Sequence, residues 1–164
     1  MTPEQLVALK NDIAADETLS QLTHTADHAF AIAAAYNLPA DPAFYVWKTD
    51  LPVVDIMANG FNWSRVDNLS VGKARIWEWM VQLGSINPSR VNVRAGIIAT
   101  WAGTTADEAV RLAVFGHCQR LATRCEKVFA TGAGTTVVVE GTGPATMAFA
   151  GDINYQDVLS AWNS

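Results

Sequence analysis

The sequence predicts a mainly α-helical protein: a helical bundle around one long central helix, followed by a C-terminal β-hairpin and a short terminal helix. Three observations lead to this prediction. Residues 104–134 carry the longest unbroken helical pattern in the chain. Apolar residues recur at helical spacing in several shorter segments before it. After residue 134 the apolar period changes to two, which is typical of strands.

The central helix is expected within residues 104–134. Thr105 and Glu108 have the spacing of a capping box, in which each side chain accepts a hydrogen bond from the other residue's backbone N–H. One apolar stripe is expected to face the core: Val114, Cys118, Leu121, Cys125 and Val128. A neighbouring stripe forms a basic edge: His117, Arg120, Arg124 and Lys127.

Shorter helices are predicted from caps, prolines and glycines at 3–15, 25–36, 52–57, 69–83, 87–103 and 154–162. Asn59-Gly60 is expected to form a turn after the third of these helices. Trp77 and Trp79 lie about 200° apart on a helical wheel, so both cannot face one core unless the helix is enclosed.

Two of these helices have a predicted inward face. In the helix at 69–83 it consists of Leu69, Ile76, Met80 and Leu83. In the helix at 87–103 it consists of Val91, Ala95, Ile98 and Trp101. The predicted hairpin strands are 135–140 and 145–150, joined by the turn at 141–144. Because a lone hairpin is marginal in water, it is expected to pack on the helices or to join a sheet shared with other copies.

Length and composition predict one domain over residues 1–164, helical at 1–131, with the hairpin and terminal helix at 135–164. Charged residues make up only 16% of the chain and there are six Trp, a composition that favours a surface covered by a partner. The longest clear apolar run, Ala29–Tyr36, is too short to span a bilayer, and the start of the chain lacks the pattern of an export signal. We therefore expect a soluble, unexported protein without a membrane partner.

Charge is distributed unevenly along the chain. Residues 1–55 contain eight acids and two lysines, which gives −6, whereas the remainder contains eight acids and nine bases, which gives +1. An acidic front and a basic helical edge would allow head-to-tail pairing between copies, a route to rings. Simple solvation of these charges remains an equal alternative.

No catalytic signature is present, so an enzyme is not expected, and neither is a cofactor or a metal. His24 and His28 are four residues apart, but His24 precedes the predicted helix and no third ligand has helical spacing to the pair. His117 and Cys118 point about 100° apart on a helix, too far for a base to activate a nucleophile. The two cysteines are expected to be buried, reduced thiols.

The candidate interface has a basic part and an apolar part. The basic residues are Arg111, His117, Arg120, Arg124 and Lys127, and the others are Trp47, Trp79, Val138, Met147 and Trp162. The basic residues would suit nucleic acid, salt bridges between or within subunits, or solvent. In the salt-bridge reading, Arg120→Glu combined with Arg124→Glu should weaken assembly and leave the monomer folded.

Five segments carry a resemblance to small proteins encoded in the structural gene modules of tailed bacteriophages and prophages. They are TPEQLVALKNDIAAD, VWKTDLPVVDI, INPSRVNVRAGI, RLATRCEKVFATGAGT and GPATMAFAGDINYQDV. The resemblance implies a non-enzymatic virion protein, assembled in the bacterial host cytoplasm. Helices with a projecting hairpin also resemble head-to-tail connector adaptors, which form rings below the portal.

The resemblance also implies partners. They would be further copies of the chain and neighbouring portal, tail or capsid proteins, with incidental contact to packaged DNA. The alternatives are another phage structural role, namely tail terminator, minor capsid or decoration protein, or a small helical nucleic-acid-binding or regulatory protein.

Overall fold

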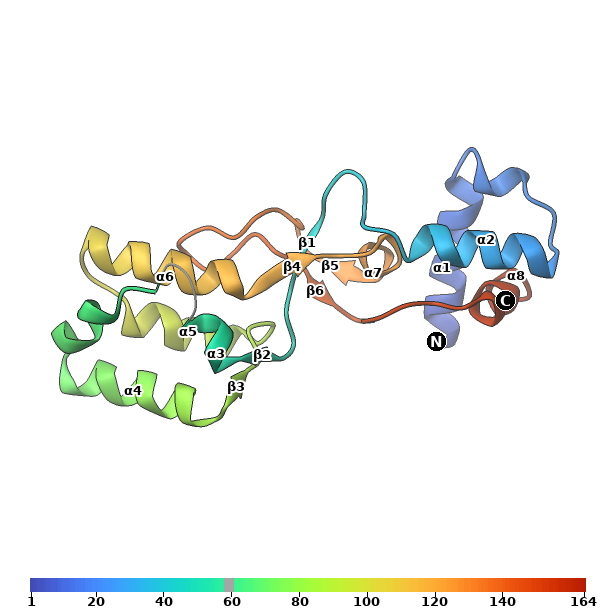
Figure 1. The fold of residues 1–164 in the computed structure, drawn as a ribbon. Coiled ribbons are helices and arrows are strands. Elements are labelled where there is room, and N and C mark those ends of the chain that lie inside the picture. The colour runs from blue at the N-terminus through green and yellow to red at the C-terminus, as the bar shows by residue number, and fades with distance from the viewer. Residues whose placement is uncertain (58–60) are drawn as a thin grey trace. The chain divides into compact units, whose positions relative to one another are not determined.

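The computed structural model describes residues 1–57 and 61–164 and confirms that the protein is mainly helical (Figure 1). The predicted turn at Asn59-Gly60 lies outside the described residues. The chain divides into two compact units: unit 1 contains residues 1–44, 121–131 and 147–164, and unit 2 contains residues 45–120 and 132–146. Each unit therefore combines segments that are distant in sequence. The single domain over residues 1–164 stays a prediction.

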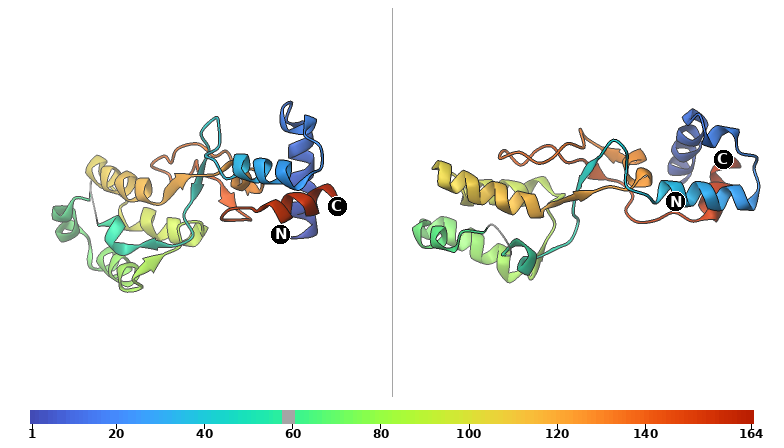
Figure 2. Two further views of the ribbon diagram at one scale, coloured as in Figure 1. Left: turned by 45° about the vertical axis from the view of Figure 1, so that its right-hand side comes forward. Right: turned by 45° about the horizontal axis from the view of Figure 1, so that its top comes forward.

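Unit 1 is built mainly from helices. They are α1 (Pro3–Ala15), the short 3-10 helix η1 (Leu19–Gln21), α2 (Ala26–Tyr36), α7 (Arg124–Val128) and α8 (Tyr155–Trp162). Helix α8 packs against both α1 and α2, as the views in Figure 2 show. Their shared core contains Leu9, Ile13, Ala29, Ile32, Ala33, Tyr36, Cys125, Phe129, Ile153, Val158 and Ala161.

Three helices of unit 1 begin at the caps that the sequence predicts. The Thr2 hydroxyl accepts from the Gln5 N–H and the Gln5 side chain accepts from the Thr2 N–H, which completes a capping box. Thr25 caps α2, and Asn154 caps α8. Helices at 3–15, 25–36 and 154–162 are thus confirmed to within a residue at each end.

Unit 2 contains most of the remaining elements. In chain order they are β1 (Tyr45–Trp47), β2 (Leu51–Pro52), α3 (Val53–Ile56), the 3-10 helix η2 (Trp63–Asn68), α4 (Val71–Gln82), β3 (Ser85–Ile86), α5 (Val91–Thr100), α6 (Thr105–His117) and β4 (Gln119–Leu121), whose last residue is counted with unit 1. Strand β1 pairs with β4, and β2 pairs antiparallel with β3, with Leu51 opposite Ile86. Two further short strands, β5 (Ala130–Thr131) and β6 (Thr146–Met147), pair with each other.

Aromatic rings form the centre of the unit 2 core. The Trp77 ring lies 5.3 Å from that of Trp101 and 5.6 Å from that of Phe61, measured between centroids. Trp77 is only 5% exposed whereas Trp79 is 65% exposed, which confirms that the two face opposite ways. No helix in the described part of the chain has both the length and the apolar character needed to cross a bilayer.

Two predicted inward faces are partly wrong. Leu83, the residue after α4, is 73% exposed. Val91 and Ala95 are exposed, and Ile97 and Thr100 are buried instead. Asn87 caps only a tight turn, accepting from the Ser89 N–H at 3.1 Å, and α5 begins four residues later than predicted. Which face of a helix is buried depends on the elements that pack on it, and these are not encoded in its own period.

The predicted long central helix is not present as one helix. Thr104 and Asp107 form the capping box, one residue before the predicted pair, and α6 ends at His117. Thr123 and Glu126 then form a second capping box that starts α7. Between the helices the backbone bonds to residues distant in sequence: in unit 2 the Lys48 N–H donates to the Cys118 carbonyl at 2.9 Å. These bonds replace the helical ones, so Leu121 is exposed and the predicted stripes do not form continuous faces.

The predicted hairpin is also only partly present, because residues 135–140 form no strand. The segment folds back on itself, with Thr135 N–H donating to the Gly143 carbonyl at 3.1 Å and Val138 N–H to the Thr142 carbonyl at 3.0 Å. Two side chains add further bonds: Gln119 accepts from the Val137 N–H, and Arg111 donates to the Val139 carbonyl. The segment is therefore held as a loop.

Candidate functional site

An open, largely apolar groove lies between α4 and α5 in unit 2. It has a volume of about 510 Å³ and is lined by Ile76, Trp79, Met80, Leu83, Ser85, Ile86, Asn87, Asn92, Val93 and Gly96. We call it the α4–α5 groove. Gly96 brings the two helices close, because a Cβ at this position would lie 3.3 Å from the Met80 sulfur. The exposed side chains of Trp79 and Leu83 contribute to its apolar surface.

Two exposed arginines belong to the elements that form this groove. Arg75 lies one turn before Trp79 on α4, and Arg90 is the residue that precedes α5. Within the described residues neither guanidinium takes part in an ion pair. The nearby acid Glu78 accepts a hydrogen bond from Gln82 at 3.2 Å. The groove is thus lined by an exposed Trp and a Met, and two exposed arginines without an ion pair in the described chain lie beside its lining residues in the sequence. Trp, Met and Arg are residue types enriched at protein interfaces.

Two of the residues predicted for an interface serve the interior of unit 2 instead. Arg111 is buried and donates to the Trp101 carbonyl at 3.1 Å and to the Val139 carbonyl at 2.7 Å. Trp47 is buried, with its ring 6.1 Å from that of Phe115 and the Arg94 guanidinium 4.7 Å from its centroid. A hydrophobic period cannot reveal such long-range partners, so the sequence left open whether these residues contact their own chain or another copy.

The predicted interface residues of unit 1 also contact other residues of that unit. The Arg124 guanidinium contacts Asp16 at 2.9 Å and Asp12 at 3.4 Å. The Lys127 amine lies 5.8 Å from the Phe44 ring centroid, and the half-buried Trp162 stacks on His24 with centroids 4.3 Å apart. Arg124 and Lys127 line a polar pocket of about 620 Å³ with Asp12, Asp16 and Asp41.

The other predicted interface residues fall at separate places in the chain. His117 ends α6, Arg120 belongs to β4 and Met147 to β6, and all three are half-buried with interactions inside the chain. Val138 is exposed on the loop at 135–140. The structure therefore does not assemble the predicted basic edge.

Only Trp79, of all the predicted residues, lies in the α4–α5 groove. Arg75, Leu83 and Arg90 were missed as candidates. The sequence does contain a pattern that points to Arg75 and Leu83. Both lie four residues from Trp79, and the three residues share the helix face opposite the buried Trp77.

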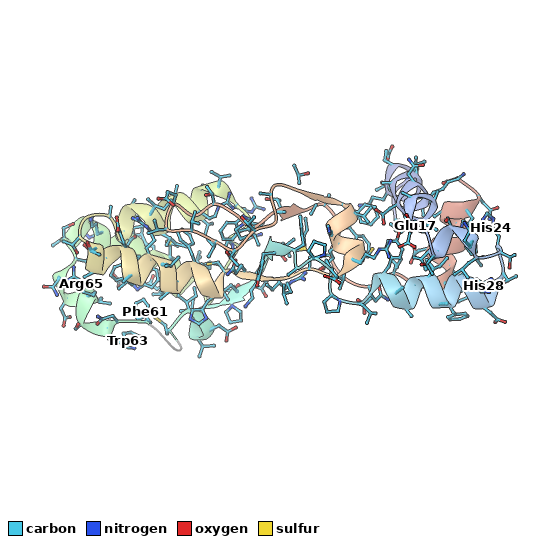
Figure 3. All side chains as sticks on the ribbon, turned by 90° about the horizontal axis from the view of Figure 1, so that it is seen from above. Glu17, His24, His28, Phe61, Trp63 and Arg65 are labelled. Atoms are coloured by element: carbon cyan, nitrogen blue, oxygen red, sulfur yellow. The ribbon has the colours of Figure 1, made fainter. Side chains whose placement is uncertain are left out.

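The histidines considered as metal ligands contact other residues of unit 1, and the two cysteines are buried. The His28 ring nitrogen Nδ1 lies 2.9 Å from the Thr23 carbonyl, and the His24 ring stacks on that of Trp162. Both histidines are labelled in Figure 3. Among residues 1–57 and 61–164, His, Cys, Asp and Glu form no group of three or more that could hold a metal ion. Burial raises the pKa of both the Cys118 and Cys125 thiols to about 12, so they stay protonated at neutral pH.

Figure 3 also labels Phe61, Trp63 and Arg65, which follow one another before α4. The Phe61 ring lies 4.9 Å from that of Trp63, and Arg65 pairs with Asp107 at 2.5 Å. This cluster anchors η2 to the start of α6 through an ion pair whose atoms are mostly buried.

No family model, no curated protein and no solved structure matches this chain.

Proposed function

We propose that this chain is a non-enzymatic structural protein of a tailed bacteriophage virion, and that it acts as a ring-forming subunit of the head-to-tail connector. Its task would be to bind further copies of itself and neighbouring portal, tail or capsid proteins. The resemblance of five sequence segments to phage structural-module proteins supplies the context of this proposal.

The observation that carries the proposal is the α4–α5 groove. Trp79 is 65% exposed and Leu83 is 73% exposed, and both line the same open hollow. Large apolar side chains gathered on one surface are typical of protein interaction sites, and Trp and Arg are the residue types that most often dominate binding energy. A surface of this kind favours a role in assembly.

The two cysteines and two of the predicted basic residues also favour a non-enzymatic structural role. The thiols of Cys118 and Cys125 are buried, and both are poor nucleophiles because burial raises their pKa. Arg111 and Arg124 bond within their own units, which weakens the alternative of a nucleic-acid-binding protein.

Native mass and shape in solution test the assembly role. We expect light scattering and negative-stain imaging to show closed oligomers, with a population that falls as salt is raised. A strict monomer at high protein concentration, at both low and high salt, would contradict ring formation by the chain itself.

The virion role requires a second experiment. In a prophage that carries this gene, deletion should yield separate heads and tails after induction, and the protein should be found by mass spectrometry in purified wild-type particles. Complete, infectious particles from the deletion strain would exclude the connector role. Affinity for DNA that falls steeply with salt in a filter-binding titration would instead favour the nucleic-acid alternative.

A further inference from the structure

We propose that the α4–α5 groove of one copy receives unit 1 of a second copy, which presents the exposed face of α2. This inference rests on the proposed function and names the two surfaces that would meet. It follows from three observations. Both surfaces are apolar, the residues beside them are oppositely charged, and the arginines near one groove would repel those near a second groove.

The exposed face of α2 matches the groove in character. It consists of Asp27, Phe30, Ala31, Ala34 and, just beyond the helix, Leu38. These residues recur at steps of three and four and therefore lie along one side of the helix. Phe30 is 56% exposed, and its ring stacks on Tyr155 at 4.2 Å between centroids. The two small alanines would let a neighbouring surface approach closely.

The two units differ in net charge. Unit 1 contains nine acids and three bases, a net charge of −6, whereas unit 2 contains seven acids and eight bases, a net charge of +1. At the level of single residues, Asp27 is exposed in the first turn of α2 and Asp41 is exposed five residues after α2 ends, and within the described chain neither is in an ion pair. These two carboxylates would form ion pairs with Arg75 and Arg90 of the other copy, which also have no ion pair in the described chain.

A symmetric contact between two grooves is disfavoured for the same reason. It would bring the helices that carry Arg75 and Arg90 in one copy close to the same helices of the other, and like charges near each other oppose association. A contact between the groove and α2 joins two different surfaces. Such a heterologous contact generates a ring when its rotation closes.

Charge reversal on each surface provides the test. The first variant carries Arg75→Glu and Arg90→Glu, and the second carries Asp27→Lys and Asp41→Lys. Each alone should lose self-association, because its groove and its α2 face then carry like charge. Mixed in equal amounts they should assemble again, because each groove then meets an α2 face of opposite charge. Sedimentation velocity at low salt measures both effects.

Apolar contacts are tested separately. Trp79→Ala should raise the protein concentration needed for half-assembly at least tenfold, as expected for a buried aromatic anchor. Val54→Ala is the matched control, since Val54 is an exposed apolar residue of unit 2 outside the groove. Glu17→Lys is the control for charge reversal on unit 1, because Glu17 is exposed and lies outside α2. Circular dichroism checks that all variants are folded.

The outcomes separate this inference from the proposed function. If both charge-reversal variants form the same oligomers as the wild type, the proposed contact is overturned and the assembly role still stands. Absence of rescue on mixing would also overturn it, and would be expected if the groove were covered by the same chain. A wild-type protein that never assembles would contradict self-assembly itself.

Discussion

The guanidinium carbon of Arg124 lies 4.3 Å from the centroid of the Tyr36 ring. The same guanidinium pairs with Asp16 at 2.9 Å, and the Tyr36 hydroxyl donates to Asp12 at 2.5 Å. This network joins α1, α2 and α7 within unit 1. The combined Arg120→Glu and Arg124→Glu variant is therefore a poor probe of assembly, because the second change would disturb the fold.

Arg124→Ala should lower the free energy of unfolding by about 2 kcal/mol, because it leaves two carboxylates without their charge-assisted partner. Tyr36→Phe keeps the ring beneath the guanidinium and removes only the hydroxyl, so a smaller loss of about 1 kcal/mol is expected. Urea unfolding followed by circular dichroism measures both. Equal stability of Arg124→Ala and the wild type would show that the network adds nothing.

Asp107 should make stability depend on pH in the acid range. The neighbouring Arg65 guanidinium and the hydrogen bonds from Thr104 lower the pKa of Asp107 to about 2. Because the folded pKa lies below the unfolded value of about 4, this contribution is present above pH 4 and is lost as the pH falls towards 2.

Asp107→Asn should therefore be about 1–2 kcal/mol less stable than the wild type at pH 7, and the difference should shrink as the pH approaches 2. Urea midpoints between pH 2 and pH 7 provide the measurement. Asp67→Asn, a change to an exposed carboxylate in η2, is the control. A difference between Asp107→Asn and the wild type that stays constant with pH would rule out the ion pair as its source.

Glu126 should be among the residues most sensitive to substitution in unit 1. It is 2% exposed, and its carboxylate accepts from the Thr123 N–H at 3.0 Å and from the Gly151 N–H at 3.1 Å. Glu126→Ala leaves both donors without this acceptor, for an expected loss of about 2–3 kcal/mol. Glu126→Gln retains one acceptor oxygen and should lose less. Equal losses for the two variants in thermal unfolding would argue for packing alone.

The two thiols should report on the units separately. Cys118 belongs to the core of unit 2 and Cys125 to that of unit 1, and both are buried. Neither should react rapidly with a thiol reagent in the native state. In the single-cysteine variants Cys118→Ser and Cys125→Ser, the urea dependence of the reaction measures the opening of one unit at a time. Coincident midpoints would support the predicted single domain, and separate midpoints would contradict it.

Gly143 should be intolerant of any side chain. Its φ is +116°, and an added Cβ would lie 2.3 Å from the Thr136 carbonyl oxygen. Gly143→Ala is expected to lose at least about 2 kcal/mol of stability, through strain in the loop at 135–140. Gly116→Ala is the contrast, because nothing lies within 4 Å of the added Cβ in α6 and alanine favours a helix by about 0.5–1 kcal/mol. Similar urea midpoints for the two variants would show that the loop relaxes freely.

The sequence by itself determined where three helices of unit 1 begin, because a cap is a local interaction. Thr2 with Gln5, Thr25 with the following helix, and Asn154 with Asp157 satisfy backbone groups within three residues of themselves. The opposite orientations of Trp77 and Trp79 followed from the helical period alone, and so the sequence located one residue of the candidate groove.

Tertiary structure decided what local patterns leave open. Residues 118–122 fit a helical period, yet their carbonyls accept from the distant Ala40 and Lys48 N–H groups, and these bonds end α6 and separate it from α7. The same holds for Arg124, which local spacing assigned to a basic edge and which instead pairs with Asp12 and Asp16. Bonds and ion pairs between residues far apart in the chain carry no periodic signal, so only the folded arrangement of each unit determines them.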